Sequence, residues 1–209
     1  MPRLTTPSNH LVQNEPDPDI RLPTSSAQAG GRGPNFFAEL IRTIPDYPKP
    51  GIQFRDISTL LLSPEGLSRS IKELASHYRE APPAIVAGIE ARGFIFGAPL
   101  AMELGVGFIP IRKRGKLPGK TISRAFELEY GTDVIEIHED ALEEGQEVLV
   151  IDDLLATGGT AGAAVELVRE CGGVVKRCGF VVVLPELGGM QRLKSAGCEV
   201  HSLCEFEGD

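Results

Sequence analysis

The sequence predicts an α/β fold in which helices cover both faces of a central parallel sheet. Short apolar runs alternate with segments of helical periodicity between residues 84 and 204. The runs are apolar almost throughout, which is typical of strands that are buried on both faces. Parallel strands that are joined by helices produce this order of elements.

The first 34 residues are predicted to form a disordered or loosely docked arm, and residues 35–209 a single domain. Residues 1–34 hold six of the 16 prolines and no aromatic residue. Without apolar periodicity, such a segment buries too little apolar surface to offset the entropy of ordering. The segment lacks the apolar core of a secretion signal, and its acidic residues argue against a transit peptide. A processed targeting segment is therefore the minor alternative. We therefore expect a cytoplasmic protein.

The domain is expected to begin with a short amphipathic helix that Asn35 caps and that ends by Pro45. Residues 47–58 contain two prolines and a glycine and are predicted to form an ordered loop. A stronger helix start follows at Ser63. There a capping hydroxyl is followed by proline at the first helical position and then by an acid at the positive end of the helix dipole.

The rest of the chain alternates between strands and helices. Strands are predicted at residues 84–89, 107–112, 147–151, 174–184 and 199–204, and helices at 94–104, 159–171 and 187–196. Residues 134–137 could extend a β-ribbon. The intervening residues 113–125 are interpreted as a loop, since they contain Gly115, Pro118 and Gly119.

Charge and composition exclude several classes of protein. The net charge is −8, from 21 Lys and Arg against 29 Asp and Glu, which makes general binding of nucleic acid or an anionic membrane unfavourable. No apolar run is long enough to span a bilayer. The four cysteines form no Cys-x-x-Cys pair and are expected to be buried free thiols, and the four histidines are scattered in the sequence and suggest no metal site.

The most informative segment is residues 148–160, where an apolar strand runs into Asp152 and Asp153 and then into a small-residue turn that opens a helix. Ligands of an open parallel sheet bind beyond the carboxyl ends of its strands. Adjacent carboxylates can accept hydrogen bonds from a vicinal diol, and the turn and helix N-terminus suit a phosphate. The pattern predicts a ribose 5-phosphate cradle; the alternative is an acidic strand end beside an ordinary helix cap. No Gly-Lys-Ser or Gly-Lys-Thr occurs, which excludes a Walker loop.

This segment resembles the signature of the type I phosphoribosyltransferases, which bind 5-phosphoribosyl-1-pyrophosphate. Residues 50–58, 88–94, and 110–119 with 128–131 resemble the branch of that family that uses adenine. The resemblance runs from about Phe36 to the C-terminus and implies a small hood and a flexible loop beside the main sheet. The implied reaction is purine salvage: adenine and phosphoribosyl pyrophosphate give AMP and pyrophosphate.

The resemblance also implies roles for particular residues. Asp152 and Asp153 would hold the ribose hydroxyls, and Arg112, Lys113 and Lys116 would contact pyrophosphate, in part across a homodimer interface. Mg²⁺ would be held by substrate oxygens and water, which leaves no direct metal ligand from the chain. The phosphoribosyl pyrophosphate site as a whole comprises Asp152, Asp153, Ala156, Thr157, Gly158, Gly159, Thr160, Ala91, Arg92, Arg112, Lys113 and Lys116.

The basic segment supports the pyrophosphate assignment. Residues 109–125 contain six cations and no acid. A leaving pyrophosphate carries several negative charges, which cationic donors must stabilise. The alternative is an ordinary solvated basic loop.

For the base, the resemblance assigns proton management to Glu129 and adenine recognition to backbone groups around Gln53, Phe54 and Arg55. By itself, Glu129 would be interpreted as an exposed strand residue. Tyr130 either contacts substrate or packs as an ordinary strand aromatic, and the Arg55 side chain could serve only in structural ion pairs.

Two other functions remain open at this point. One is a regulatory protein that retains the fold for sensing; the acidic chain and an arm too short for a DNA-binding module argue against it. The other is a transferase for xanthine or a pyrimidine. Enzymes of the 6-oxopurine branch carry an aspartate where this chain has Ala156, and its absence also makes hypoxanthine and guanine unfavourable substrates.

Overall fold

The computed structural model describes residues 35–127 and 131–207, and the predicted arm over residues 1–34 lies outside them. The described helices are α1 (Phe36–Leu40), α2 (Ser58–Leu62), α3 (Pro64–Tyr78), α4 (Arg92–Leu104), α5 (Gly159–Glu170), α6 (Gly189–Ser195) and the 3₁₀ helix η1 (Pro185–Leu187). The strands are β1 (Arg42–Pro45), β2 (Gln53–Asp56), β3 (Ile85–Ile89), β4 (Gly107–Lys113), β5 (Thr121–Glu127), β6 (Thr132–His138), β7 (Glu147–Leu155), β8 (Val174–Val183) and β9 (Glu199–Glu205).

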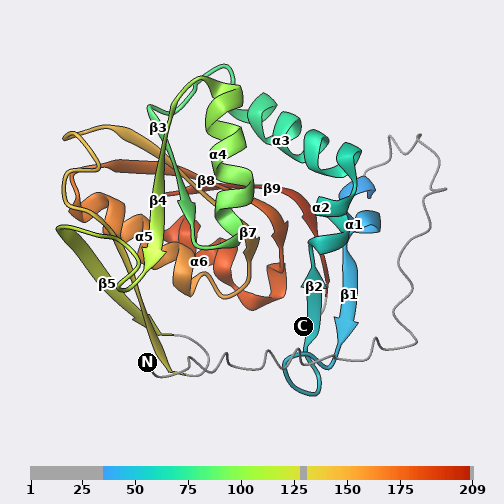
Figure 1. Cartoon of the computed structure of the whole chain (residues 1–209). Helices are drawn as coiled ribbons and strands as arrows, with labels where there is room; N and C mark the ends of the chain where they lie inside the picture. The colour runs from blue at the N-terminus through green and yellow to red at the C-terminus, as the bar shows by residue number, and fades with distance from the viewer. Residues whose placement is uncertain (1–34, 128–130, 208–209) are drawn as a thin grey trace, which may run out of the picture. The chain divides into compact units, whose positions relative to one another are not determined.

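The main sheet contains seven strands in the order β5-β6-β4-β3-β7-β8-β9 (Figure 1). From β4 to β9 all neighbours are parallel, as predicted, whereas β6 pairs antiparallel with both β4 and β5. Strand β3 lies between β4 and β7, so the residues that follow β3 emerge between the carboxyl ends of those two strands.

The hood region differs from the sequence prediction. In this region, strands β1 and β2 form an antiparallel two-stranded sheet, in which Arg42 lies opposite Asp56. The sequence predicts instead a helix end over residues 42–45 and a loop over residues 53–56. Helix α1 therefore ends at Leu40, and Asn35 makes no side-chain capping bond. The prolines that suggested a loop lie in the connection between the strands, so they do not break the pairing.

The helix start at Ser63 is confirmed. The Ser63 side chain accepts a hydrogen bond from the Gly66 N–H at 3.0 Å, and Pro64 occupies the first position of α3. Helix α2, which lies just before it, was not predicted, because its five residues are too few to show a helical repeat.

The basic segment is only partly a loop. Residues 121–127 form β5, which pairs with β6 over seven residue pairs. The expected flexible loop over 113–125 therefore reduces to residues 114–120. Alternation in β5 is weak, since four of its seven residues are half-buried or buried and two of those four are charged or polar. This weak alternation conceals the strand from a periodicity search.

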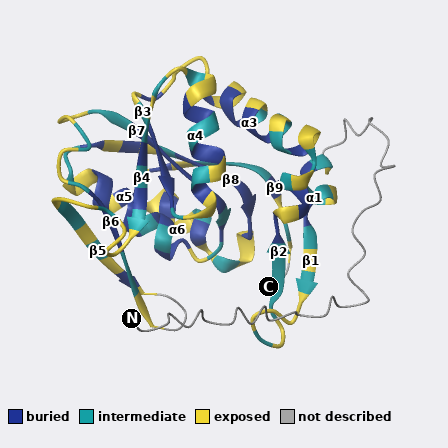
Figure 2. Cartoon of the chain, in the orientation of Figure 1, coloured by how far each residue is buried: buried dark blue, intermediate teal, exposed yellow. Residues whose placement is uncertain are grey.

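Two apolar clusters lie on opposite faces of the sheet (Figure 2). One joins α3 and α4 to the sheet through residues such as Leu74, Phe96 and Leu149, and the other joins α5 through residues such as Val165 and Leu167. Burial on both faces explains the continuous apolar runs of β3, β7 and β8. In the described part of the chain, no helix is long and apolar enough to cross a membrane.

Candidate functional site

Strand β7 places the two adjacent acids at its carboxyl-terminal end. The strand extends to Leu155, beyond the predicted end at residue 151, because Asp152, Leu154 and Leu155 continue the parallel pairing with β8. Successive side chains of a strand point to opposite faces, so the two carboxylates leave β7 in different directions. Asp153 is 2% exposed, and Asp152 is half-buried.

Two adjoining cavities surround these acids. One, of about 210 Å³, is lined by Arg92 and by residues 152–161. The other, of about 220 Å³, is lined by Glu90 and Ala91, which follow β3, by residues of β4, β5, β6 and β7 that include Lys113 and Asp133, and by the first residues of α4 and α5. Both cavities share Arg92, Asp152, Asp153 and Thr160. The predicted cradle is therefore one wall of a larger hollow.

Burial raises the pKa of both aspartates. For Asp152, desolvation is the largest cause and the neighbouring charge of Asp153 adds to it, so its pKa lies well above the usual range. For Asp153, desolvation again dominates, and the Arg92 guanidinium opposes it only in part. The two carboxyl groups thus resist carrying two full charges in the ligand-free protein.

The geometry around Asp153 leaves acceptor capacity unused. Its Oδ2 lies 3.0 Å from Arg92 Nε, but among the described residues this buried oxygen accepts no hydrogen bond with good alignment. A close ion pair without an aligned donor leaves room for another partner at the same oxygen.

The turn after β7 depends on close backbone approach. Gly158 has φ +75°, and a Cβ there would lie 2.9 Å from the Cα of Gly189. The Gly189 N–H donates to the carbonyl of Ala156 at 3.0 Å, which ties the turn to the start of α6. Helix α5 begins at Gly159, so its unpaired N–H groups face the same cavity as Thr157 and Thr160.

The segment after β3 brings a second set of charges to the hollow. Arg92 is the first residue of α4, and Ala91 precedes it. Glu90 accepts hydrogen bonds from Arg112 Nε and Nη2, both at 3.2 Å, and from the Lys113 N–H at 2.8 Å. Burial alone would raise the pKa of Glu90, but these hydrogen bonds outweigh it and lower the pKa below its usual range.

The predicted pyrophosphate cations are placed unequally. Lys113 lines the cavity with Asp152 and forms an ion pair with Asp133 at 3.1 Å. Arg112 reaches that cavity only through its pair with Glu90, and Lys116 does not line either cavity. Arg124 of β5 instead pairs with Glu166 and Glu170 of α5. Half of the six cations are therefore paired across elements, which a simple solvated loop would not show.

The hood, which is the two-stranded sheet of β1 and β2, places the aromatic ring of Phe54 near Arg92. The Arg92 guanidinium carbon lies 5.9 Å from the centroid of Phe54, which in turn packs edge to face against Tyr47. Arg55 points elsewhere: it donates to Thr43 Oγ1 at 2.6 Å and to the Glu207 carbonyl at 3.1 Å, and it covers the Phe206 ring. The ion pairs considered for Arg55 are not found among the described residues; Asp56 pairs with Arg42 instead.

Glu129 and Tyr130 lie outside the described residues, so the structure places neither of them. Gln53 is half-buried in β2, where it lies opposite Pro45 of β1.

Three acids near the site escaped sequence reasoning: Glu90, Asp133 and Glu136. Glu90 had a signal in the sequence, because it directly precedes Ala91 and Arg92 within residues 88–94, which carry part of the family resemblance. Asp133 and Glu136 had none, because polar residues on a short strand are usually solvated.

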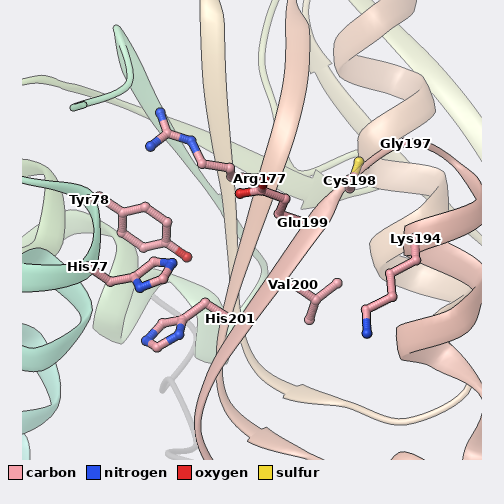
Figure 3. A pocket seen from close by; sticks show the side chains of 9 residues that line it. All are labelled: His77, Tyr78, Arg177, Lys194, Gly197, Cys198, Glu199, Val200 and His201. Atoms are coloured by element: carbon pink, nitrogen blue, oxygen red, sulfur yellow. The ribbon is translucent and has the colours of Figure 1, made fainter. Parts of the chain in front are cut away.

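A separate hollow of about 500 Å³ lies between the end of α3, α6 and strands β8 and β9 (Figure 3). The imidazoles of His77 and His201 stack there at 3.8 Å, so these two histidines are not scattered in space. Burial, and then the neighbouring His77, lowers the pKa of His201 to about 4. Cys198 also lines this hollow; all four cysteines are free, and three are buried.

The site can hold a small, highly charged ester. It combines two carboxylates, a turn with helix N–H groups, and Arg92 and Lys113 within one hollow. Carboxylates suit hydroxyl groups, whereas N–H groups and cations suit phosphates.

The chain matches the phosphoribosyl transferase domain family over residues 59–201. It is 59% identical to an adenine phosphoribosyltransferase of Shewanella frigidimarina over 169 residues, which are 81% of this chain and 93% of the relative.

Two solved structures show the same fold. An adenine phosphoribosyltransferase of Saccharomyces cerevisiae, in complex with adenine and an imino-altritol bisphosphate, has a TM-score of 0.77 at 36% identity and covers 82% of this chain and 98% of its own. A Trypanosoma brucei adenine phosphoribosyl transferase, in complex with AMP, pyrophosphate and ribose-5-phosphate, has a TM-score of 0.76 at 25% identity and covers 82% and 78%.

Proposed function

This chain belongs to the phosphoribosyltransferase family, within its adenine phosphoribosyltransferases, and from that membership we propose how its residues divide the reaction. The enzyme transfers the 5-phosphoribosyl group of phosphoribosyl pyrophosphate to adenine, and AMP and pyrophosphate are the products. The observation that carries the residue assignment is the shared hollow in which Asp152 and Asp153 lie beside Arg92, Lys113 and the turn into α5.

The ribose 5-phosphate is assigned to the end of β7. Asp152 and Asp153 accept hydrogen bonds from the ribose hydroxyls, and the unused Oδ2 of Asp153 supports this role. The 5-phosphate lies against the turn from Ala156 to Thr160, where helix N–H groups and two threonine hydroxyls donate.

The pyrophosphate is assigned to the cationic side of the hollow. Lys113 and Arg92 line it directly, and the Ala91 backbone lies between Arg92 and Glu90. Arg112 and Lys116 would reach pyrophosphate in a homodimer, where the partner subunit would bring them to the site. Charge that develops on the leaving group is then stabilised by donors already in place.

Adenine is assigned to the hood side, near Phe54 and the backbone of Gln53 and Arg55. Support comes from the contact between Phe54 and Arg92, which places the hood ring beside the phosphate-binding arginine. Glu129 handles the purine proton, and Tyr130 contacts substrate. Ala156 leaves no carboxylate in the turn, which favours adenine over 6-oxopurines.

The acid pair fits a magnesium ion bound with substrate. Asp152 and Asp153 present carboxylate oxygens, one of them lacking an aligned donor, in a place where burial raises both pKa values. Hard oxygen ligands and water are what Mg²⁺ prefers, so contact through water suits this pair. When bound, the ion neutralises negative charge on the pyrophosphate leaving group.

Two further assignments complete the proposal. Residues 35–209 form the catalytic domain, and residues 1–34 are an arm outside it. The protein works in the cytoplasm as a homodimer and binds neither nucleic acid nor membrane, as its net charge of −8 suggests.

A coupled assay with adenine, hypoxanthine, guanine and orotate tests the proposal. Adenine should be preferred, and Glu129→Gln should lower kcat about 10²–10⁴-fold, the usual contribution of a general acid–base group. A preferred base other than adenine would contradict the specificity. An unchanged kcat in Glu129→Gln would show that a group other than Glu129 handles the purine proton.

A further inference from the structure

Strand β6 carries a buried carboxylate to which the reaction assigns no role. Glu136 is 4% exposed and lies opposite Arg112 in the antiparallel pairing of β6 with β4. Its Oε1 accepts hydrogen bonds from the N–H groups of Lys116 and Leu117, each at 3.1 Å. Successive N–H groups that converge on one anionic oxygen make a charge-assisted arrangement, which is stronger than its neutral equivalent.

The loop over residues 114–120 is held at further points. The Lys116 N–H also donates to the Lys113 carbonyl at 3.2 Å, which closes a tight turn. Arg112 Nη1 donates to the Lys116 carbonyl at 3.0 Å. His138 Nε2 lies 2.9 Å from the Pro118 carbonyl. His138 is two residues after Glu136, so both side chains leave β6 on the same side and reach the same loop.

The loop needs such support because of its charge. Five cations occur between residues 112 and 120, and no acid lies among them. Like charges at short distance repel, which favours an extended and variable loop. Glu136 supplies a negative charge from the neighbouring strand, next to the backbone of the turn that joins Lys113 to Lys116.

We propose that Glu136 is a positioning residue for pyrophosphate binding: it fixes the backbone of the 114–120 loop, so that Lys113 and Lys116 are placed before phosphoribosyl pyrophosphate arrives. The inference rests on the assignment of this loop to pyrophosphate under the proposed function. Ordering the loop in advance lowers the entropy cost of binding. Glu136 itself does not touch substrate.

The kinetic test uses the full chain with Glu136→Gln and Glu136→Ala. Glu136→Gln keeps an acceptor oxygen without its charge, so the KM for phosphoribosyl pyrophosphate should rise about fivefold, and about tenfold or more in Glu136→Ala. The KM for adenine and kcat should stay within about twofold. Glu143→Gln, an exposed glutamate in the turn after β6, is the matched control and should leave every constant unchanged.

Limited proteolysis supplies a readout that does not depend on activity. Trypsin cleavage after residues 113, 114, 116 and 120 of the ligand-free protein, mapped by mass spectrometry, should be faster in both Glu136 variants than in Glu143→Gln. If Glu136→Ala fails to fold, the isosteric Glu136→Gln still tests the inference.

The outcomes separate the two levels of the argument when Lys116→Ala is measured alongside. A raised KM in Lys116→Ala with unchanged KM and cleavage in the Glu136 variants would overturn the role of Glu136 alone. A lower kcat or melting temperature in the Glu136 variants without a change in KM would reduce Glu136 to an ordinary structural residue. Faster cleavage with no change of KM in any variant would show that the loop does not bind pyrophosphate, and this result would overturn the inference as well.

Discussion

At the scale of single residues, the site keeps two neighbouring carboxyl groups out of water. Asp152 and Asp153 have raised pKa values, mainly because they are buried; Arg92 lowers both only in part, and among the described residues it forms its ion pair with Asp153. Such an arrangement lowers the stability of the free protein and is relieved by a ligand that brings hydroxyl groups or a cation. Function and stability are therefore in conflict at the end of β7.

We predict that Asp152→Asn stabilises the ligand-free protein at pH 7.5 and weakens the binding of phosphoribosyl pyrophosphate. The folded-state pKa of Asp152 is raised above its unfolded value near 3.9, so the parent protein loses stability as pH rises from about 4 through the folded-state pKa. An asparagine carries no charge and avoids this loss. Thermal melts should show a higher melting temperature, by about 2–4 °C for each kcal/mol recovered.

The pH dependence provides the internal check for Asp152→Asn. The difference in melting temperature from the parent should shrink towards pH 4, where the parent carboxyl group is already protonated. Asp140→Asn, at an exposed aspartate after β6, should show no such difference. A variant less stable than the parent at pH 7.5 would show that the Asp152 charge stabilises the fold.

At the scale of elements, α4 lies against β7 at the site with no space between the backbones. A Cβ on Gly93 would lie 2.6 Å from the Ile151 carbonyl oxygen and 3.1 Å from Asp152 Oδ1. Because Gly93 directly follows Arg92, this approach sets the distance between the arginine and the acid pair. The N-terminal turn of α4 and the end of β7 therefore act as one unit.

Gly93→Ala should separate α4 from β7 and displace Asp152. Overpacking at a tight contact costs about 1–3 kcal/mol, and the KM for phosphoribosyl pyrophosphate should rise together with that loss of stability. Denaturant unfolding and steady-state kinetics measure the two effects. Gly107→Ala in β4 is the control, because its Cβ would find its nearest neighbour at an ordinary 3.8 Å. Equal behaviour of the two variants would contradict the close approach.

At the scale of the whole molecule, positive charge is concentrated in one segment of an otherwise acidic chain. The net charge is −8, whereas six cations gather in residues 109–125. Of these, Lys113 reaches the hollow at the carboxyl ends of β3 and β7. An acidic chain that presents local positive charge at one hollow suits a small phosphate ester better than a long polyanion.

Deletion of residues 2–33 should leave the kinetic constants within about twofold of those of the full chain. The described residues 35–127 and 131–207 already contain the complete seven-stranded sheet and both walls of the hollow. The same coupled assay with adenine measures the effect, and gel filtration reports any change of oligomeric state. A large loss of activity in the truncated protein would show that the arm packs against the core or takes part in a contact between subunits.

The predictable parts of the fold and the site have a common property. The sequence predicts most strands of the parallel sheet, the start of α3, and the strand end, acid pair and turn at the end of β7, because contiguous residues encode each of them. The errors lie in β1, β2 and β5, whose residues become strands only through antiparallel partners. Pairing energy from a distant segment can override weak local preference.

The sequence by itself determined the α/β class, the small-residue turn after β7, the acid pair and the basic segment, because local side-chain chemistry and spacing encode them. Only the tertiary structure decided that Lys113 lines the hollow while Lys116 does not, that Phe54 lies beside Arg92, and that Glu90 and Glu136 hold the basic strand and loop. These contacts depend on the order of strands in the sheet and on the direction of each side chain. Both are set when the whole chain packs, because contacts between distant segments form only then.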